Sequence, residues 1–256
     1  MWDPQQYAKF ADHRSRPFGE LVSRVAAESP RLVYDLGCGS GQLTATLSER
    51  WPMARIVGVD NDPAMLARTS RHATKQLSFV EGDLNTFVPP AGADIVISNA
   101  AYQWVDDNPA RLRAIAAQLP ADGWLAVQVP GNFAAPSHTL LRELIAEPRW
   151  AEATNHLQLR ESPVLDAAGY GELFASEGLV VDTWETVYNQ VLTGEDPVLE
   201  WVKGSALRPV LDVLSQADAE GFIADLRPRL REAYPATTAG TVYGFRRVFA
   251  VGHRPA

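Results

Sequence analysis

Short apolar runs alternate with segments of helical period along the first half of the chain. The apolar runs have the length of buried strands and lie at 32–34, 55–59, 77–81, 93–98 and 124–129. Between them, a helical period extends over 42–50, from 63 to 69 or beyond, and over 109–119. Strands that are apolar on both faces and alternate with helices are typical of a parallel sheet covered by helices on both sides.

The second half of the chain predicts fewer strands and more helix. A sixth strand is predicted over 179–192 and a last one over 241–251, and helical patterns cover 139–146 and, with internal prolines, 197–234. We interpret residues 193–240 as a helical cap inserted before the last strand. The predicted fold class is α/β: a doubly wound, mainly parallel, seven-stranded sheet within a single domain over residues 1–256.

The N-terminal segment, residues 1–29, precedes the first strand and predicts two short helices that separate near Pro17, because proline interrupts a helix. Trp2, Tyr7 and Phe10 have the spacing of a helix face that packs into a core, and ionisable residues follow directly. Two interpretations stay open for this segment: packing against the core, and a helical lid over a polar ligand.

The first strand ends at Asp35 in a turn with glycine at alternate positions, Gly37, Gly39 and Gly41. Glycine lets the backbone approach a ligand without a Cβ in the way. The dinucleotide fingerprint requires a further glycine where this chain has Gln42, and the carboxylate of Asp35 would repel a pyrophosphate. The turn therefore predicts a site for a positively charged nucleoside, with an ammonium or sulfonium group.

Composition excludes several partners. The net charge of −8, with no run of Lys and Arg, disfavours nucleic acid. No apolar run approaches the roughly 18 residues of a membrane span and no signal peptide is evident, so we expect a soluble, cytoplasmic protein. The single cysteine, Cys38, lies in the glycine turn and excludes an internal disulfide or a cysteine-rich metal cluster. We predict no metal site and no nucleophilic role for Cys38.

The turn resembles the first motif of the class I S-adenosylmethionine (SAM)-dependent methyltransferases, E/D-x-G-x-G-x-G, whose every position is filled by Asp35, Gly37, Gly39 and Gly41. Ser40 stands where proline is frequent, which the backbone should tolerate. Longer segments resemble the trans-aconitate 2-methyltransferase family within that class: 2–7, 14–17, 34–39, 103–104, 136–138, 201–204 and 245–247. The resemblance implies a Rossmann-like fold with residues 30–130 as the SAM-binding core, and methylation of one carboxylate of trans-aconitate.

The resemblance also implies roles for individual residues in binding SAM. Asp35 and the glycines would hold its methionine end, and Asp60 would bind its ribose, a role that the end of the second strand also favours. Asp83 would meet the adenine and Leu84 would pack on the ring, although a plain turn aspartate fits the pattern at Asp83 equally well. The expected cofactor-binding residues are Asp35, Gly37, Gly39, Gly41, Gln42, Asp60, Asn61, Asp83, Leu84 and Asn99.

Cations and hydroxyl donors gather in the predicted cap of a chain that is acidic overall. Arginine suits planar contact with carboxylates and tyrosine adds a neutral donor, so the cap predicts a small anionic substrate, a tricarboxylate by resemblance. The alternative for each cation alone is a solvated surface charge. Period two places Arg246 and Arg247 on opposite faces, so only one readily points into a pocket. The expected substrate-binding residues are Tyr7, His13, Arg14, Gln103, Trp104, His138, Trp201, Lys203, Arg208, Tyr243 and Arg246.

No catalytic residue is predicted, because a carboxylate nucleophile needs alignment and removal of water rather than a general base. The alternatives are a methyltransferase acting on another organic acid or on a hydroxyl, and a SAM-binding regulatory module without turnover. A hydroxyl substrate would require a base, for which His13 and His138 are the candidates. The sequence leaves open whether the chain is a monomer or a dimer.

Overall fold

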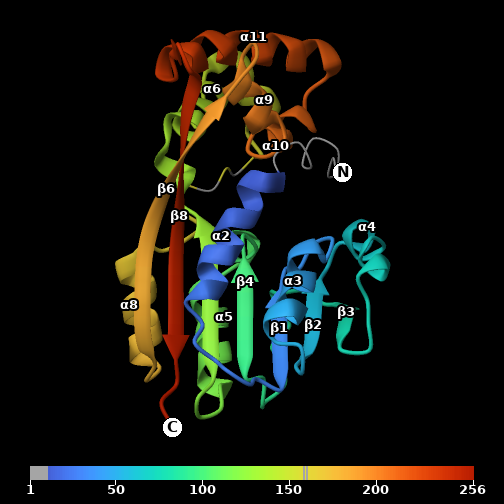
Figure 1. The fold of residues 1–256 in the computed structure, drawn as a ribbon. Coiled ribbons are helices and arrows are strands. Elements are labelled where there is room, and N and C mark those ends of the chain that lie inside the picture. Colours follow the sequence, from blue (N-terminus) through green and yellow to red (C-terminus); the bar gives the residue numbers. More distant parts are fainter. Residues whose placement is uncertain (1–10, 158, 160) are drawn as a thin grey trace. The chain divides into compact units, whose positions relative to one another are not determined.

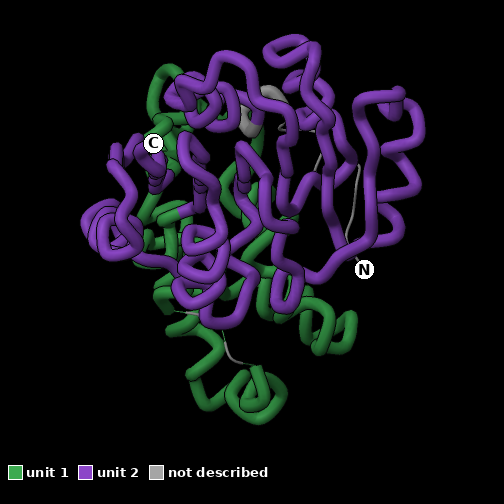
Figure 2. The backbone as a smooth tube through the Cα atoms, turned by 90° about the horizontal axis from the view of Figure 1, so that it is seen from below, with its two compact units in different colours: residues 1–13, 131–163, 187–246 green, residues 14–130, 164–186, 247–256 purple. Residues whose placement is uncertain are grey.

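A computed structural model describes residues 11–157, 159 and 161–256, with side chains from residue 15 onward. The chain divides into two compact units (Figure 2). Unit 1 comprises residues 1–13, 131–163 and 187–246, and unit 2 comprises 14–130, 164–186 and 247–256. Each unit is described by itself below.

Unit 2 contains the parallel part of the sheet, whose strands lie side by side in Figure 1. Its parallel strands are β1 (Leu32–Leu36), β2 (Arg55–Asp60), β3 (Leu77–Glu81), β4 (Ile95–Asn99) and β5 (Trp124–Pro130). The strand order is β3-β2-β1-β4-β5-β8-β6, with β6 at Val180–Leu192 and β8 at Gly240–His253. β8 pairs with β5 in antiparallel register, Trp124 opposite His253. The predicted α/β fold with a mainly parallel sheet is confirmed, and a short eighth strand, β7 (Ala236–Thr237), pairs with β8.

Helices connect these strands. The helical period predicts α3 (Gln42–Arg50) and α5 (Asn108–Gln118), whereas it does not predict α8 (Ala167–Ser176). Helix α4 (Pro63–Leu66) begins where predicted but ends before residue 69, and a 3₁₀ turn follows at Thr69–Arg71. Asp62 caps α4 by accepting hydrogen bonds from the backbone N–H groups of Ala64 and Met65, as predicted from its place before Pro63. Buried apolar residues of the strands and of α5 and α8, among them Leu36 and Tyr170, form one core. This core fixes the strand ends that carry the candidate site.

Unit 1 is mainly helical and has a core of its own, which includes Leu144, Phe222 and Tyr243. Helix α11, the longest of the helices described in this unit, packs against α6. Unit 1 takes helices from residues 131–163 as well as from the predicted cap, 193–240. Its helices are α6 (Pro136–Ile145), α7 (Pro148–Thr154), α9 (Pro197–Lys203), α10 (Arg208–Leu211) and α11 (Gln216–Ala233).

Two predicted helix boundaries are wrong. Helix α2 (Ala11–Ser23) runs through Pro17 without a break, since losing one backbone hydrogen bond does not outweigh packing of its face, where Phe18 and Leu21 are buried. Helix α6 begins at Pro136 rather than at 139, because proline suits the first position of a helix. Ser137 and His138 therefore lie in the first turn of α6.

Some elements were not predicted from the sequence, namely α7, α8 and β7. The helical span predicted over 197–234 is divided into α9, α10 and α11. In the part of the chain that the structure describes, no helix combines the length and the apolar character needed to cross a bilayer.

Candidate functional site

The glycine turn is tied to the carboxyl end of the neighbouring strand. The backbone N–H groups of Gly37 and Cys38 both donate to the carbonyl of Val59, at 2.8 and 3.0 Å. Gly37, Gly39 and Gly41 have φ angles of 81°, 56° and 76°, in the left-handed region that favours glycine. Three left-handed residues in alternation give the chain the tight reversal from β1 into α3.

The three glycines have different surroundings. A Cβ added to Gly37 would lie 2.2 Å from Cβ of Ala101, and one added to Gly41 would lie 2.6 Å from Cε1 of Phe79. A Cβ added to Gly39 would meet nothing within 4 Å. Packing inside unit 2 therefore requires glycine at the two outer positions, whereas Gly39 faces open space that a ligand can occupy.

Asp60 holds this turn from the end of β2. Its Oδ2 accepts a hydrogen bond from the backbone N–H of Gly39 at 2.7 Å, and its Oδ1 accepts one from the N–H of Asp62 at 2.9 Å. The carboxylate is thus fixed in orientation beside the open face of Gly39. Sequence reasoning placed Asp60 in the pocket, and the structure brings it to the glycine turn.

Asp35 is a buried carboxylate below the turn. Its side chain is 3% exposed, and its Oδ2 accepts a hydrogen bond from Oγ1 of Thr44 at 2.6 Å. The pKa of Asp35 is raised to about 6, mainly by burial and to a smaller extent by the negative charge of Asp60, while the hydrogen bond from Thr44 partly opposes the shift. Two carboxylates close to one turn favour a cationic ligand, whose charge would offset this cost.

Cys38 is unsuited to nucleophilic chemistry. Burial and the charges of Asp35 and Asp60 raise the pKa of its thiol far above the usual range, so the reactive thiolate is not formed at neutral pH. Among the described residues, no group of three His, Cys, Asp and Glu side chains is placed to hold a metal ion. The turn offers backbone and carboxylates rather than a nucleophile.

The end of β3 carries the residues expected at the adenine. Asp83 is exposed, and its Oδ1 accepts hydrogen bonds from the backbone N–H and the Nδ2 of Asn85, both at 2.9 Å. Leu84 is 9% exposed and belongs to the core of unit 2. Gln42 and Asn61, also expected at the cofactor, are exposed at the starts of α3 and of the loop after β2.

The end of β4 combines strain with an unused acceptor. Ala100 has a φ angle of 57°, in the left-handed region that residues with a Cβ rarely adopt. Oδ1 of Asn99 is buried and accepts no hydrogen bond from the described residues. Gln103 is buried and its Nε2 donates to the carbonyl of Ala100 at 2.7 Å, whereas Trp104 is 62% exposed. Asn99 is therefore ready to accept a hydrogen bond from a ligand.

In unit 1, three of the predicted substrate residues lie together. Oγ of Ser137 is 3.1 Å from Nδ1 of His138 and 3.2 Å from Oη of Tyr243. Trp201 packs against Tyr243, with their ring centroids 5.6 Å apart. Burial and the charge of Arg142 lower the pKa of His138 to about 4, so the imidazole is neutral at neutral pH.

The predicted cations of unit 1 all contact acceptors within the protein. Nζ of Lys203 lies 2.6 Å from Oε1 of Glu200, and Nε of Arg208 lies 3.6 Å from Oδ2 of Asp212. Nη1 of Arg246 donates to the carbonyl of Gly131 at 3.2 Å. To bind a carboxylate of a ligand, each of these cations would have to keep its present acceptor as a shared partner or give it up.

Three predicted residues cannot be placed. Tyr7 lies outside the described residues, and His13 and Arg14 lie in α2 outside the described side chains. Sequence reasoning missed Thr44 and Ser137, which hold Asp35 and His138. Thr44 could have been found from the sequence, because it places a hydroxyl on the buried face of α3. Nothing in the sequence connects Ser137 with a residue as distant along the chain as Tyr243.

A cavity of about 310 Å³ also lies in unit 1. Its lining includes Asp196, Leu199, Arg231 and Tyr234, and it contains none of the residues predicted for the site. Asp196 and Arg231 already pair with each other there. We therefore assign the candidate site by the chemistry of the strand ends rather than by this cavity.

Comparison with known proteins identifies relatives over the whole chain. A methyltransferase domain family matches residues 33–123, which contain the glycine turn. The trans-aconitate 2-methyltransferase of Streptomyces avermitilis is 48% identical over 100% of this chain and 97% of that protein. The enzyme of the same name from Rhodococcus jostii is 49% identical over 98% of each chain.

A solved structure is similar in fold. The YcgJ protein of Bacillus subtilis matches 95% of this chain and 99% of its own, with a TM-score of 0.60 and 17% identity. At that identity the likeness establishes the fold alone, whereas the two full-length relatives are far closer in sequence. The chain with this glycine turn, its two carboxylates and its mainly parallel sheet therefore belongs to the trans-aconitate 2-methyltransferase family of methyltransferases.

Proposed function

We propose that the protein transfers the methyl group of SAM to one carboxylate of trans-aconitate, giving the monomethyl ester and S-adenosylhomocysteine. The proposal that SAM is the cofactor rests on the pair of carboxylates, Asp35 and Asp60, at the glycine turn, and on the open space over Gly39. Near-complete coverage at 48% identity by a trans-aconitate 2-methyltransferase supports the substrate half.

The residues at the strand ends of unit 2 fit the different parts of SAM. The anionic Asp35 suits the charge of its methionine end, and the fixed Asp60 suits ribose hydroxyl donors. The unused Oδ1 of Asn99 fits an amino donor of the cofactor. The carboxylate of the exposed Asp83 can accept a hydrogen bond from an adenine that lies beside the buried Leu84. The remaining proposed contacts are the backbone of Gly37 and Gly41 and the side chains of Gln42 and Asn61.

When bound, SAM supplies a methyl group that is already activated by its sulfonium. The protein then has to align the acceptor carboxylate in line with it and exclude water, and alignment of this kind contributes about 7–11 kcal/mol at best. No general base is required for a carboxylate. His138, with a pKa of about 4, is a poor base at neutral pH, which favours a carboxylate over a hydroxyl as the acceptor.

For the acid itself, we propose the residues named from the sequence. In unit 1, His138, Trp201 and Tyr243 lie together, and Lys203, Arg208 and Arg246 add positive charge. Gln103 and Trp104 follow β4 in unit 2. Tyr7, His13 and Arg14 stay predictions from the resemblance.

The test is the formation of S-adenosylhomocysteine from SAM with trans-aconitate, cis-aconitate, citrate and isocitrate offered separately at one pH. We expect turnover selective for trans-aconitate, and a single methyl ester by mass spectrometry. Tight SAM binding without turnover on any of the four acids would contradict the substrate half and retain the cofactor half. Preference for NAD over SAM would contradict both.

A further inference from the structure

A hydrogen-bonded chain of side chains is centred on Ser137, at the second position of α6. Ser137 is 1% exposed, and its Oγ lies 3.1 Å from Nδ1 of His138 and 3.2 Å from Oη of Tyr243. Its backbone N–H donates to Oη of Tyr234 at 3.0 Å. The backbone contact anchors the serine, so its hydroxyl is held between a ring nitrogen and a phenol.

The acid strengths of these groups set the direction of the chain. The geometry of the Ser137–Tyr243 contact allows either oxygen to donate. A phenol, with a pKa of about 10, is a stronger acid than an aliphatic alcohol, which favours Tyr243 as the donor and Oγ of Ser137 as the acceptor. The single proton of Ser137 then goes to Nδ1 of His138, and the two consecutive hydrogen bonds strengthen each other. An imidazole whose Nδ1 accepts a hydrogen bond carries its proton on Nε2.

The other end of His138 is free to meet a ligand. Its ring is partly exposed, and Nε2 has no hydrogen-bond partner among the described residues. The ring of Phe133 packs edge-on against it, with centroids 5.6 Å apart, which restricts its rotation. Burial and the charge of Arg142 hold the pKa of His138 near 4, so the ring stays neutral.

We propose that Ser137 is a positioning residue that fixes His138 in the tautomer offering a neutral Nε2–H donor to a carboxylate of the substrate. This inference rests on the proposed function for the identity of the ligand. The alternative tautomer would place a lone pair at Nε2, which repels a carboxylate. Selecting one tautomer thus gives a hydrogen-bond donor without a second buried charge.

The tautomer can be measured directly in the free protein by long-range ¹H–¹⁵N correlation on ¹⁵N-histidine-labelled samples. The chain has five histidines, and His138→Gln assigns the resonances of His138 by their disappearance. We expect a protonated Nε2 and an unprotonated Nδ1 in the wild type, and averaging of both nitrogens in Ser137→Ala. A proton on Nδ1 in the wild type, or an unchanged tautomer in Ser137→Ala, would overturn the inference.

The kinetic consequence should be confined to the acid. Losing one neutral hydrogen bond is expected to raise KM for trans-aconitate about 3- to 10-fold in Ser137→Ala, with KM for SAM unchanged and kcat within about twofold. Ser137→Ala keeps the backbone N–H that donates to Tyr234, so the fold should persist. The matched control is Ser23→Ala, an exposed serine whose hydroxyl donates only to the carbonyl of Glu20 among the described residues.

Tyr243→Phe provides a second variant in the same chain of hydrogen bonds. The double variant with Ser137→Ala should raise KM less than the product of the two single effects, because both remove parts of one network. Independent effects would contradict a shared network. Absence of turnover in the wild type would contradict the proposed function and its carboxylate ligand, whereas a wild-type Nδ1–H tautomer contradicts the role of Ser137 alone.

Discussion

At the scale of single residues, the buried carboxylate of Asp35 carries a cost in stability. Its pKa is raised from 3.8 to about 6, mainly by burial, so the folded protein holds a proton over a pH range in which the unfolded chain has lost it. The free energy of unfolding therefore falls as pH rises from about 4 to about 6, and the ionised group remains a cost at pH 7. A cationic ligand offsets that cost.

Asp35→Asn should separate stability from ligand binding. Removing the buried charge is expected to raise the free energy of unfolding of the free protein at pH 7 by about 2–3 kcal/mol. The same change should weaken SAM binding about 10- to 100-fold, because a charge-assisted contact is lost. Urea denaturation and calorimetric titration measure the two effects. A less stable variant, or one with unchanged SAM affinity, would contradict this role of Asp35.

Gly39 offers a second test, because its surroundings are open. Gly39→Ala is expected to cost about 1–2 kcal/mol for a left-handed residue with a Cβ, and to reduce SAM binding because that Cβ would occupy the space proposed for the ligand. Gly92 is the matched control, with a φ angle of 95° and nothing within 4 Å of an added Cβ. Gly92→Ala should lose similar stability and keep full SAM affinity. Equal affinities for the two variants would remove Gly39 from the site.

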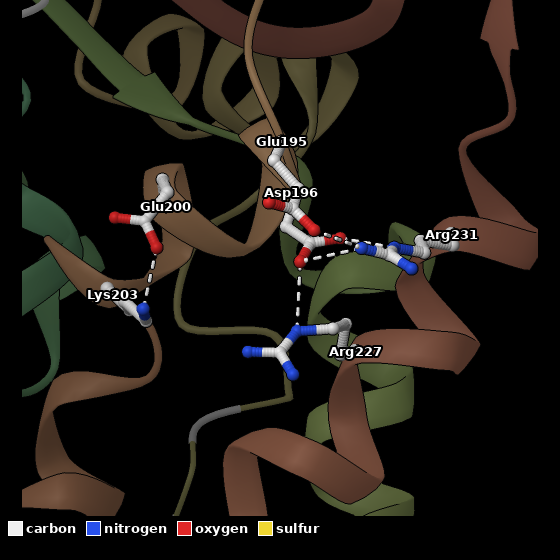
Figure 3. A network of polar contacts seen from close by, with 6 residues as sticks. All are labelled: Glu195, Asp196, Glu200, Lys203, Arg227 and Arg231. Atoms are coloured by element: carbon white, nitrogen blue, oxygen red, sulfur yellow. Dashed lines mark hydrogen bonds and ion pairs between the residues drawn. The ribbon is translucent and has the colours of Figure 1, made fainter. Parts of the chain in front are cut away.

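At the scale of elements, Asp196 joins two helices of unit 1 (Figure 3). It precedes α9 with a φ angle of 52°, and its side chain, 10% exposed, accepts hydrogen bonds from Arg231 of α11 and forms an ion pair with Arg227 of the same helix. Nε of Arg227 lies 2.9 Å from its Oδ2, and Arg231 pairs with both of its oxygens. Both helices belong to the core of unit 1, so this network supports the element that carries Trp201 and Lys203.

Asp196→Ala should therefore destabilise the protein. We expect the free energy of unfolding to fall by about 1–2 kcal/mol, since charged hydrogen bonds are lost and a left-handed residue remains. Glu195→Ala is the matched control, because Glu195 is 86% exposed and contributes little through its contact with Arg231. Chemical denaturation of both variants measures the difference. Equal losses would show that burial of Asp196 is unimportant.

The elements also show where sequence patterns succeed. The bounds of α3, Gln42–Arg50, agree with prediction because the glycine turn starts the helix and its apolar positions share one face. The break expected at Pro17 and the late start expected for α6 are wrong, because proline was weighed without its packing or its position in the helix. Local sequence rules were sufficient to predict an element where the residues that start or end it agree with the pattern of burial along it.

At the scale of the whole molecule, the proposed reaction has a defined pH dependence. The value of kcat/KM for SAM should fall as pH drops through about 6, because Asp35 takes up a proton in the free protein. Above pH 7 the rate should stay flat, since a carboxylate acceptor needs no base. Initial rates at subsaturating SAM from pH 5 to 9 test this. A rising basic limb would favour a hydroxyl acceptor, and Asp35→Asn should remove the acidic limb.

The candidate cofactor site could largely be proposed from the sequence, because its residues follow strands in a fixed order. Asp35, Gly39 and Asp60 each end a strand or occupy its turn, and parallel strands place such ends at one edge of the sheet. The substrate residues could be listed but not ranked. Lys203 pairs with Glu200 within α9, and Arg208 pairs with Asp212 directly after α10, which a list of cations does not show.

The sequence by itself determined the fold class, the cofactor turn and the family, because these depend on local period, glycine spacing and residue identity. The tertiary structure decided what depends on distant neighbours: the burial that raises the pKa of Asp35, the open space over Gly39, and the contact of Ser137 with Tyr243. Burial and long-range hydrogen bonds arise only when remote segments pack together, so no local pattern encodes them.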